Sequence, residues 1–277
     1  SASSYTDRLA ESGATIAIGH DPANVENADA VIFSAAIKSD NPELRRAAEA
    51  EIPIVRRAEI VGRLMDEKSG IAVAGTHGKT TTTAMIAMIL DRSGLSPGYL
   101  IGAESRDLGG NARWGEGDHL VVEADEYDSA FLEYNPDIAL VTHIEPDHLD
   151  YFGSIKNMVD KYCAFVGRVR EGGSLFIRNE GPLVKYAAAA TSSPVVWFGD
   201  GGHWVIDDYR PLGWGSEFTV IGPSGARFPA HLAVPGLHNA YNALAAIAAT
   251  ANLGVETEAS VRILRDFSGV DRRFQIL

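Results

Sequence analysis

The stretch from Gly75 to Thr83, GTHGKTTTT, constrains this chain more than any other feature of its sequence. An apolar run of strand length, Ile71 to Ala74, precedes it, and a helical-looking segment, Ala84 to Leu90, follows it. Two glycines at such a junction let successive backbone N–H groups point at one spot, where the helix N-terminus adds partial positive charge. The stretch therefore predicts a phosphate-binding loop.

The loop departs from the common G-x-x-x-x-G-K-[ST] pattern, because Val73 stands where the first glycine is expected. Lys79 can neutralise the outer phosphates of a nucleotide, and the Thr80 hydroxyl can ligate Mg²⁺. A plain glycine-rich turn with a threonine cap is the alternative interpretation. The strand, the G-K-T sequence and the helix together favour a nucleotide site, and the short loop favours a ligase over GTPases and motor proteins.

Acidic residues follow the predicted strand His119 to Glu123. Glu123 stands at the carboxyl end of that strand, the edge where ligands bind in open parallel sheets, and its carboxylate can hold Mg²⁺ directly or through water. Asp125, Glu126 and Asp128 come next. Such residues are more often helix caps or part of a solvated loop, so this segment alone is a weak indication of a site.

A second polar cluster follows the predicted strand Ile138 to Thr142; it consists of His143, Glu145, Asp147, His148 and Asp150. Zinc is one alternative, because histidine is its commonest protein ligand. A surface cluster without function is another. The cluster contains no cysteine, and its carboxylates suit a harder cation. Three strand ends that meet at one edge of a sheet favour a magnesium–nucleotide site.

Strand-like and helical segments alternate along most of the chain. The predicted strands are Thr15–Ile18, Ala30–Ser34, Ile52–Val55, Ile71–Ala74, His119–Glu123, Ile138–Thr142, Ser174–Ile177 and Val195–Phe198. The predicted helices are Thr6–Ser12, Leu44–Ala50, Arg57–Met65, Asn239–Ala251 and Glu258–Phe267. Because these strands are continuously apolar, they indicate an α/β fold with a parallel sheet covered on both faces. Residues 199–234 predict a small extra β region.

Two domains are expected. Residues 1–67 form a partial Rossmann-like domain that lacks its opening strand and glycine-rich turn, about 30 residues if one β-α unit is missing. Residues 68–277 form a central ATPase domain of the P-loop type, with a parallel sheet.

Net charge, cysteine count and the length of the apolar runs limit the classes of partner and the compartment that the sequence fits. A formal net charge of −13 argues against nucleic acid, because binding phosphate backbones needs a basic face. The single cysteine, Cys163, fits a reducing compartment. No apolar run approaches the roughly 18 residues of a membrane helix, so no membrane insertion is expected.

Two further pairs suit nucleotide recognition. Asn239 and Asn242 share one face of a predicted helix, and carboxamides can pair with the edge of an adenine; alternatively Asn239 is a cap and Asn242 is incidental. Arg272 and Arg273 stand near the last residue, where they suit phosphate contacts or are simply exposed.

Taken together, these motifs resemble the Mur ligase family. The matching stretches, in order, are SAAIKSDNPEL, IPIVRRAEIVGRLM, AGTHGKTTTTAMIA, GGNARWG, VVEADEYDSAF, IEPDHLD, PGLHNAYNALAA and GVDRRF. They most resemble the branch that adds L-alanine. The branch that recycles muropeptides, adding a tripeptide, shares GTHGKTTTT and EADEYD and is the nearest competitor.

The resemblance implies a cytoplasmic, ATP- and Mg²⁺-dependent ligase of peptidoglycan precursors, monomeric or weakly dimeric, that joins L-alanine to UDP-N-acetylmuramate through an acyl phosphate. It implies that Lys79, Glu123 and His148 are catalytic. It also implies that Thr80 and Glu123 ligate one magnesium ion and that His148 ligates a second ion near the acyl phosphate. The implied ATP-binding residues are Gly75, Thr76, His77, Gly78, Lys79, Thr80, Thr81, His238, Asn239, Asn242 and Arg273. Those implied to face the UDP-sugar are Ser34, Ala35, Arg56, Arg57 and Asp125.

The sequence also departs from the family. The third domain that follows the RRF segment in the family is expected to be absent, which would leave a nucleotide-binding fragment without turnover. His143 stands where the family usually has asparagine. No carbamylated lysine is assigned, although Lys161 lies nearby, and the resemblance gives His77 no chemical role.

Overall fold

The computed structural model describes residues 4–271, with the backbone alone at Ser4 and Asp128. The chain divides into two compact units, the first ending at Val61 and the second beginning at Gly62. Each unit is described by itself.

The first unit contains a two-stranded parallel sheet and short helices. Its elements are α1 (Ser4–Glu11), the 3₁₀ helix η1 (Pro22–Val25), β1 (Val31–Phe33), α2 (Pro42–Glu49) and β2 (Ile54–Arg56), and α3 (Arg57–Asp66) leads out of it. α2 begins at Pro42, two residues before the predicted start at Leu44. Asn41 Oδ1 accepts from the Glu43 backbone N–H at 2.8 Å, while Pro42 needs no such partner.

The predicted strand Thr15–Ile18 is wrong. These residues belong to no strand, and Ile18 is 64% exposed. An apolar run becomes a strand only when a neighbouring strand takes up its backbone hydrogen bonds. In the described part of this unit, β1 and β2 pair with each other alone.

The second unit contains a seven-stranded sheet in the order β5-β4-β6-β3-β7-β8-β9. Its strands are β3 (Ser69–Ala74), β4 (Gly98–Ser105), β5 (Gly110–Arg113), β6 (His119–Glu123), β7 (Ile138–Val141), β8 (Ser174–Arg178) and β9 (Val195–Phe198). All neighbouring strands are parallel except β4 and β5. The predicted parallel sheet is confirmed. β4 was not predicted, because Gly98 and Gly102 limit its apolar run to Tyr99, Leu100 and Ile101.

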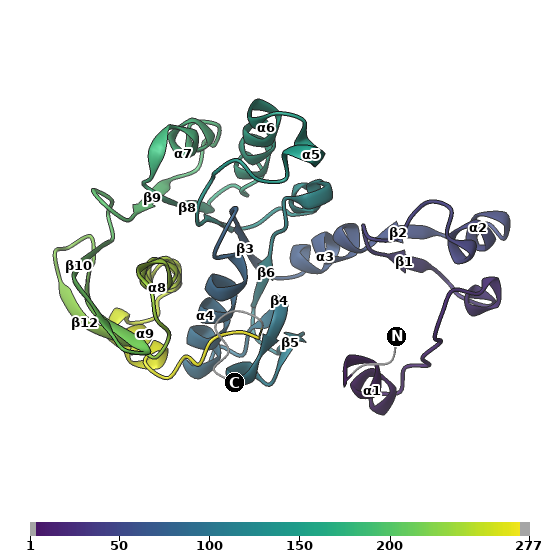
Figure 1. Ribbon diagram of the computed structural model, residues 1–277, viewed down its shortest axis with the longest axis horizontal. Helices are drawn as coiled ribbons and strands as arrows, with labels where there is room; N and C mark the ends of the chain where they lie inside the picture. The colour runs from purple at the N-terminus through teal and green to yellow at the C-terminus, as the bar shows by residue number, and fades with distance from the viewer. Residues whose placement is uncertain (1–3, 272–277) are drawn as a thin grey trace. The chain divides into compact units, whose positions relative to one another are not determined.

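Helices cover both faces of this sheet. The helices of this unit after α3 are α4 (Lys79–Arg92), η2 (Arg106–Leu108), η3 (Tyr127–Glu133), α5 (Leu149–Phe152), α6 (Ile155–Val166), α7 (Gly181–Ala188), α8 (Leu237–Ala251) and α9 (Thr257–Leu264). On β3, Ile71 and Val73 join the core beneath α4 and α8, whereas the equally buried Ala72 and Ala74 do not. Successive side chains of a strand point to opposite faces, and Figure 1 shows α6 and α7 on the other side of the sheet from α4 and α8.

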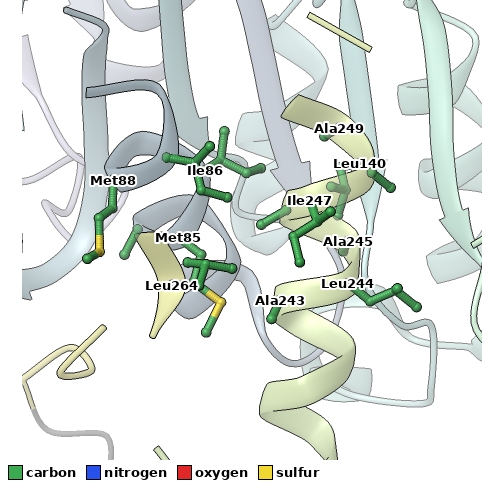
Figure 2. Close-up of a cluster of buried hydrophobic side chains, with 14 of the residues drawn as sticks. Met85, Ile86, Met88, Leu140, Ala243, Leu244, Ala245, Ile247, Ala249 and Leu264 are labelled. Carbon is green, nitrogen blue, oxygen red and sulfur yellow. The ribbon is translucent and has the colours of Figure 1, made fainter. Parts of the chain in front are cut away.

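The core is densest where α4 meets α8. Every residue of α4 from Thr80 to Leu90 is buried. α8 is rich in alanine, whose small side chain permits close approach. Figure 2 shows Met85 and Ile86 of α4 in one cluster with Ile247 of α8 and Leu264 of α9. This packing fixes α4, and with it the loop that precedes α4.

The small β region is an antiparallel sheet of β10 (Val205–Leu212), β11 (Gly215–Ile221) and β12 (Arg227–Leu232). It packs on α8 and α9 (Figure 1), so the predicted extra β region is confirmed. Among the described residues, no helix combines the length and the apolar character needed to cross a lipid bilayer.

Candidate functional site

The loop between β3 and α4 has the backbone shape that its glycines permit. Gly75 has φ +132° and Gly78 has φ +85°, conformations that side chains disfavour. A Cβ atom on Gly78 would collide with Asn242 Oδ1 of α8. The loop therefore forms a narrow cradle at the N-terminus of a buried 14-residue helix, the setting in which backbone N–H groups bind phosphate.

The neighbouring strand β7 and the residues after it hold this short loop in place. The Thr76 backbone N–H donates to the His143 oxygen at 2.9 Å. The Glu145 backbone N–H donates to Thr76 Oγ1 at 3.0 Å. His77 Nε2 lies 2.6 Å from Glu145 Oε1. These contacts tie the loop to the residues that follow β7 and place His77 beside Glu145.

Lys79 is paired inside the protein. Its ammonium donates to the Gly75 oxygen at 2.7 Å and to Glu126 Oε1 at 2.9 Å. The side chains of Lys79 and Glu126 are only 12% and 3% exposed. Burial raises the pKa of Glu126, and the charge of Lys79 opposes that rise. The ammonium of Lys79 is therefore held at the loop by Gly75 and Glu126.

Thr80 and Glu123 meet beside the loop. Thr80 Oγ1 donates to Glu123 Oε1 at 2.9 Å, and Glu123 Oε2 accepts from the Gly102 backbone N–H at 2.7 Å. A Cβ atom on Gly102 would lie 2.6 Å from Glu123 Oε2, so glycine there leaves room for the carboxylate. One hydroxyl and one carboxylate fit Mg²⁺, which is usually bound by one or two carboxylates together with substrate phosphates.

His148, the third predicted metal ligand, makes other contacts. Its backbone is left-handed at φ +47°, its ring lies edge-on to Tyr127 at 5.9 Å, and Nε2 is 3.9 Å from Asp147 Oδ2. The described residues contain no group of three or more His, Cys, Asp or Glu side chains that could hold a metal ion. Thr80 and Glu123 are thus in direct contact, whereas the role of His148 as a ligand of a second magnesium ion stays a prediction.

A cavity of about 620 Å³ adjoins the loop. Its lining residues come from the loop and α4 (His77, Gly78, Thr81), from the ends of β7 and β8 and the residues that follow (Thr142, His143, Glu145, Arg178, Glu180), from β9 (Phe198), from Val234 and α8 (His238, Asn239, Tyr241, Asn242), and from Phe267, Gly269 and Val270 after α9.

Asn242 Nδ2 donates to Asn239 Oδ1 at 3.3 Å, so the predicted pair shares one helix face. Burial lowers the pKa of His238.

Arg178 and Tyr241 are two of the lining residues that the sequence analysis did not identify as site residues. The Arg178 guanidinium carbon lies 3.9 Å from the centre of the Tyr241 ring. The Tyr241 hydroxyl donates to Asp200 Oδ1 at 2.9 Å. Burial is the main cause that raises the pKa of Tyr241, and this hydrogen bond is the second. Arg178 directly follows the predicted strand Ser174–Ile177, so the rule that ligands bind at the carboxyl edge could have identified it.

His143, which replaces the asparagine usual in the family, connects two loops. Its Nε2 lies 3.3 Å from Glu145 Oε2 and its Nδ1 lies 3.1 Å from Glu180 Oε2. The hydrogen bond with His143 is the main cause that lowers the pKa of Glu145. Arg178 Nε lies 2.9 Å from the same oxygen of Glu180, so the side chains of Glu145, His143, Glu180 and Arg178 form one continuous polar wall of the cavity.

The residues predicted to face the UDP-sugar lie mainly in the first unit. Ser34 and Ala35 directly follow β1, while Arg56 ends β2 and Arg57 begins α3. Because β1 and β2 are parallel, all four stand at one edge of that small sheet. In the second unit, Asp125 Oδ1 accepts from the Tyr127 backbone N–H at 3.1 Å. Arg273 lies outside the described residues.

Comparison with known proteins decides the family. Residues 73–250 match the Mur ligase middle domain, and residues 1–69 match the region described as Mur ligase family, catalytic domain. The chain belongs to the Mur ligase family. The resemblance predicted from the sequence is thereby confirmed.

The UDP-N-acetylmuramate–L-alanine ligase of Burkholderia multivorans is one curated relative of this Mur ligase. It is 44% identical over 273 residues, which are 98% of this chain and 59% of that protein. The corresponding ligase of Burkholderia vietnamiensis is 43% identical over 278 residues, 99% of this chain and 60% of that protein. The chain therefore spans about three-fifths of the length of these relatives.

Solved structures show the same fold. The UDP-N-acetylmuramate–alanine ligase of Thermotoga maritima gives a TM-score of 0.86 at 30% identity, covering 98% of this chain and 62% of that chain. The UDP-N-acetylmuramate:L-alanyl-γ-D-glutamyl-meso-diaminopimelate ligase of Neisseria meningitides gives 0.87 at 26% identity, covering 97% and 88%. The two scores are so similar that the backbone does not separate the alanine-adding branch from the recycling branch.

Proposed function

We propose that this chain is the UDP-sugar- and ATP-binding part of a UDP-N-acetylmuramate–L-alanine ligase that acts in the cytoplasm in peptidoglycan precursor synthesis. The observation that carries the proposal is the 44% identity, over 98% of the chain, to a relative of that name. The placement of Lys79, Thr80 and Glu123 around one loop supports the ATP-dependent part of the reaction.

The proposed reaction needs ATP because a carboxylate is a poor electrophile. The lactyl carboxylate of UDP-N-acetylmuramate attacks the γ-phosphorus, the bond to the β-phosphate oxygen breaks, and ADP leaves. The amine of L-alanine then attacks the acyl carbon, the C–N bond forms, and inorganic phosphate departs with the C–O electron pair as the amine loses a proton. Phosphoryl transfer of this kind depends on positioning and charge neutralisation.

The residues near the loop match those needs. The N–H groups at the start of α4 would bind the phosphates, and Lys79 would turn from Glu126 toward the outer ones. Thr80 and Glu123 would hold Mg²⁺, with His148 holding a second ion. Bound Mg²⁺ supplies positive charge that neutralises the transferring phosphoryl group. His238, Asn239 and Asn242 in the adjoining cavity would take the adenine, and Arg273 a phosphate.

The domains follow from the same proposal. We assign residues 1–67 to UDP-sugar binding, with Ser34, Ala35, Arg56 and Arg57. We assign residues 68–277 to ATP binding, and within them Asp125 to the UDP-sugar. A monomer or a weak homodimer is expected.

A second candidate function is the ligation of a tripeptide, as the name of the Neisseria relative describes. The test measures phosphate release by the full-length protein with ATP, Mg²⁺ and UDP-N-acetylmuramate. We expect release with L-alanine and little with L-alanyl-γ-D-glutamyl-meso-diaminopimelate. Equal or faster release with the tripeptide would replace the alanine-adding proposal with the recycling one. Nucleotide binding without turnover, even in the full-length protein, would leave a binding module.

A further inference from the structure

One wall of the cavity beside the phosphate loop belongs to no helix. Phe267, Gly269 and Val270 line it just after α9 ends. Phe267 and Val270 are buried, at 0% and 4% exposure, and Gly269 has φ +96°. A segment without regular backbone hydrogen bonds needs other partners to keep one shape.

Asp107 of η2 supplies those partners at Ser268. Both the backbone N–H and Oγ of Ser268 donate to Asp107 Oδ2, at 2.8 Å and 3.1 Å. Three residues further on, the Asp271 backbone N–H donates to the Glu104 oxygen at 2.9 Å. The two ties lie on either side of Gly269 and Val270, so the wall residues are fixed at both ends.

The element that carries Asp107 is itself anchored. η2 lies between β4 and β5, and the Tyr99 hydroxyl donates to the Leu108 oxygen at 2.8 Å. The same strand β4 provides the Gly102 N–H that binds Glu123 Oε2. One strand therefore holds both the carboxylate beside the phosphate loop and the cavity wall.

We propose that Asp107 is a positioning residue for nucleotide binding, which fixes Ser268 and thereby the Phe267–Val270 wall of the cavity. The inference rests on the proposed function, because that proposal places an adenine nucleotide in this cavity. Hydrogen bonds to an ionised carboxylate are roughly twice as strong as neutral ones. Without them, the wall segment must be ordered at the moment of binding, and that ordering weakens affinity.

The test titrates Mg-ADP into the full-length protein and its variants by calorimetry. Asp107→Ala is expected to weaken binding about tenfold, the effect of losing one or two net hydrogen bonds. Asp107→Asn keeps an acceptor oxygen and should retain most of the affinity. Asp118→Ala is the matched control, since among the described residues its carboxylate makes no hydrogen bond or ion pair, and it should bind as wild type does. Binding of UDP-N-acetylmuramate should be unchanged in every variant.

The coupling between Asp107 and Ser268 separates positioning from general damage. Ser268→Ala alone should weaken Mg-ADP binding, about threefold for one lost hydroxyl bond, and should add nothing in an Asp107→Ala background. Wild-type affinity in Asp107→Ala, or full additivity in the double variant, would overturn the inference. Should Asp107→Ala fail to fold, Ser268→Ala decides, because unchanged affinity in that variant also overturns it. A wild-type protein that does not bind Mg-ADP refutes the proposed function instead.

Discussion

Lys79 and Glu126 form a buried ion pair at the head of α4, with the ammonium 2.9 Å from one carboxylate oxygen and 2.8 Å from the other. Glu126 follows β6 and Lys79 follows β3, and these strands are neighbours in the sheet. The protein thus carries its own counterion for the lysine. A phosphate group that enters the loop would compete with Glu126 for Lys79, so the pair couples stability to nucleotide binding.

Lys79→Met should destabilise the nucleotide-free protein by about 3 kcal/mol, because it leaves a buried carboxylate without its partner. It should also abolish Mg-ADP binding. The double variant Lys79→Met, Glu126→Gln should recover most of the stability, since no buried charge then lacks a partner, yet still fail to bind nucleotide. Urea unfolding measures the first effect and calorimetry the second. A double variant no more stable than Lys79→Met would contradict the importance of this pair.

The stability of the protein should depend on pH through Glu126. Burial raises the native pKa of Glu126 above the ordinary value of a glutamate side chain, so the native state binds this proton more tightly than the unfolded chain does. Its contribution to the free energy of unfolding is therefore full below the unfolded pKa and is lost as pH rises through the native pKa. Glu126→Gln cannot titrate. The free energy of unfolding of wild type, compared with that of Glu126→Gln, should therefore be highest near pH 4, about the unfolded pKa, and lower at pH 8.

Urea titrations of both proteins across that range measure the effect. A stability difference that shifts toward wild type as pH rises would show that the Lys79 charge outweighs burial at this carboxylate.

The sequence was sufficient for those parts of the site that local pattern determines. A strand, two glycines, Gly-Lys-Thr and a helix fix where the phosphate loop lies, and Glu123 follows from the rule that carboxyl ends of parallel strands share one edge. Local pattern also made Glu126 look like a solvated loop residue, because acidic residues that follow a strand are more often exposed. Its surroundings include Lys79, 47 residues earlier in the chain, and Tyr162 of α6, whose pKa is raised by burial and also by the charge of Glu126. Neither contact leaves a pattern in the sequence next to Glu126.

Other features depended on which distant segments meet. The cavity wall at Phe267 and Gly269 is built only when the chain returns to β4 after α9, more than 150 residues later along the sequence, as the bond between Ser268 and Asp107 shows. Conversely, Thr15–Ile18 has the composition of a strand but lacks a partner strand in the described part of its unit. Local residue propensity can favour a strand, but the strand forms only when another strand pairs with it in the folded chain.

Thr80→Val should weaken the magnesium-dependent part of nucleotide binding. The change keeps the shape of the side chain but removes the hydroxyl that donates to Glu123 Oε1. We expect ADP affinity in the presence of Mg²⁺ to fall about tenfold, as for a lost hydrogen bond to a charged group, and affinity with chelator present to change little. Thr82→Val is the matched control in the same helix turn, because Thr82 Oγ1 is buried and has no partner in the described structure. Similar losses in both variants would point to helix packing instead of the metal.

Gly78→Ala should disrupt the phosphate loop through both its backbone and its contacts. The residue has φ +85°, and an added Cβ would meet the Asn242 carboxamide, whose side chain is buried against Asn239. Gly94→Ala is a control for the cost of the left-handed backbone alone, since Gly94 has φ +79° but an added Cβ would have no atom within 4 Å. Both changes should lower the free energy of unfolding by about 1 kcal/mol for the left-handed conformation. Only Gly78→Ala should also lose Mg-ADP binding and shift the Asn239–Asn242 resonances in the amide spectrum. If the two alanine variants bind Mg-ADP equally well, the close approach of α8 to the loop has no part in nucleotide recognition.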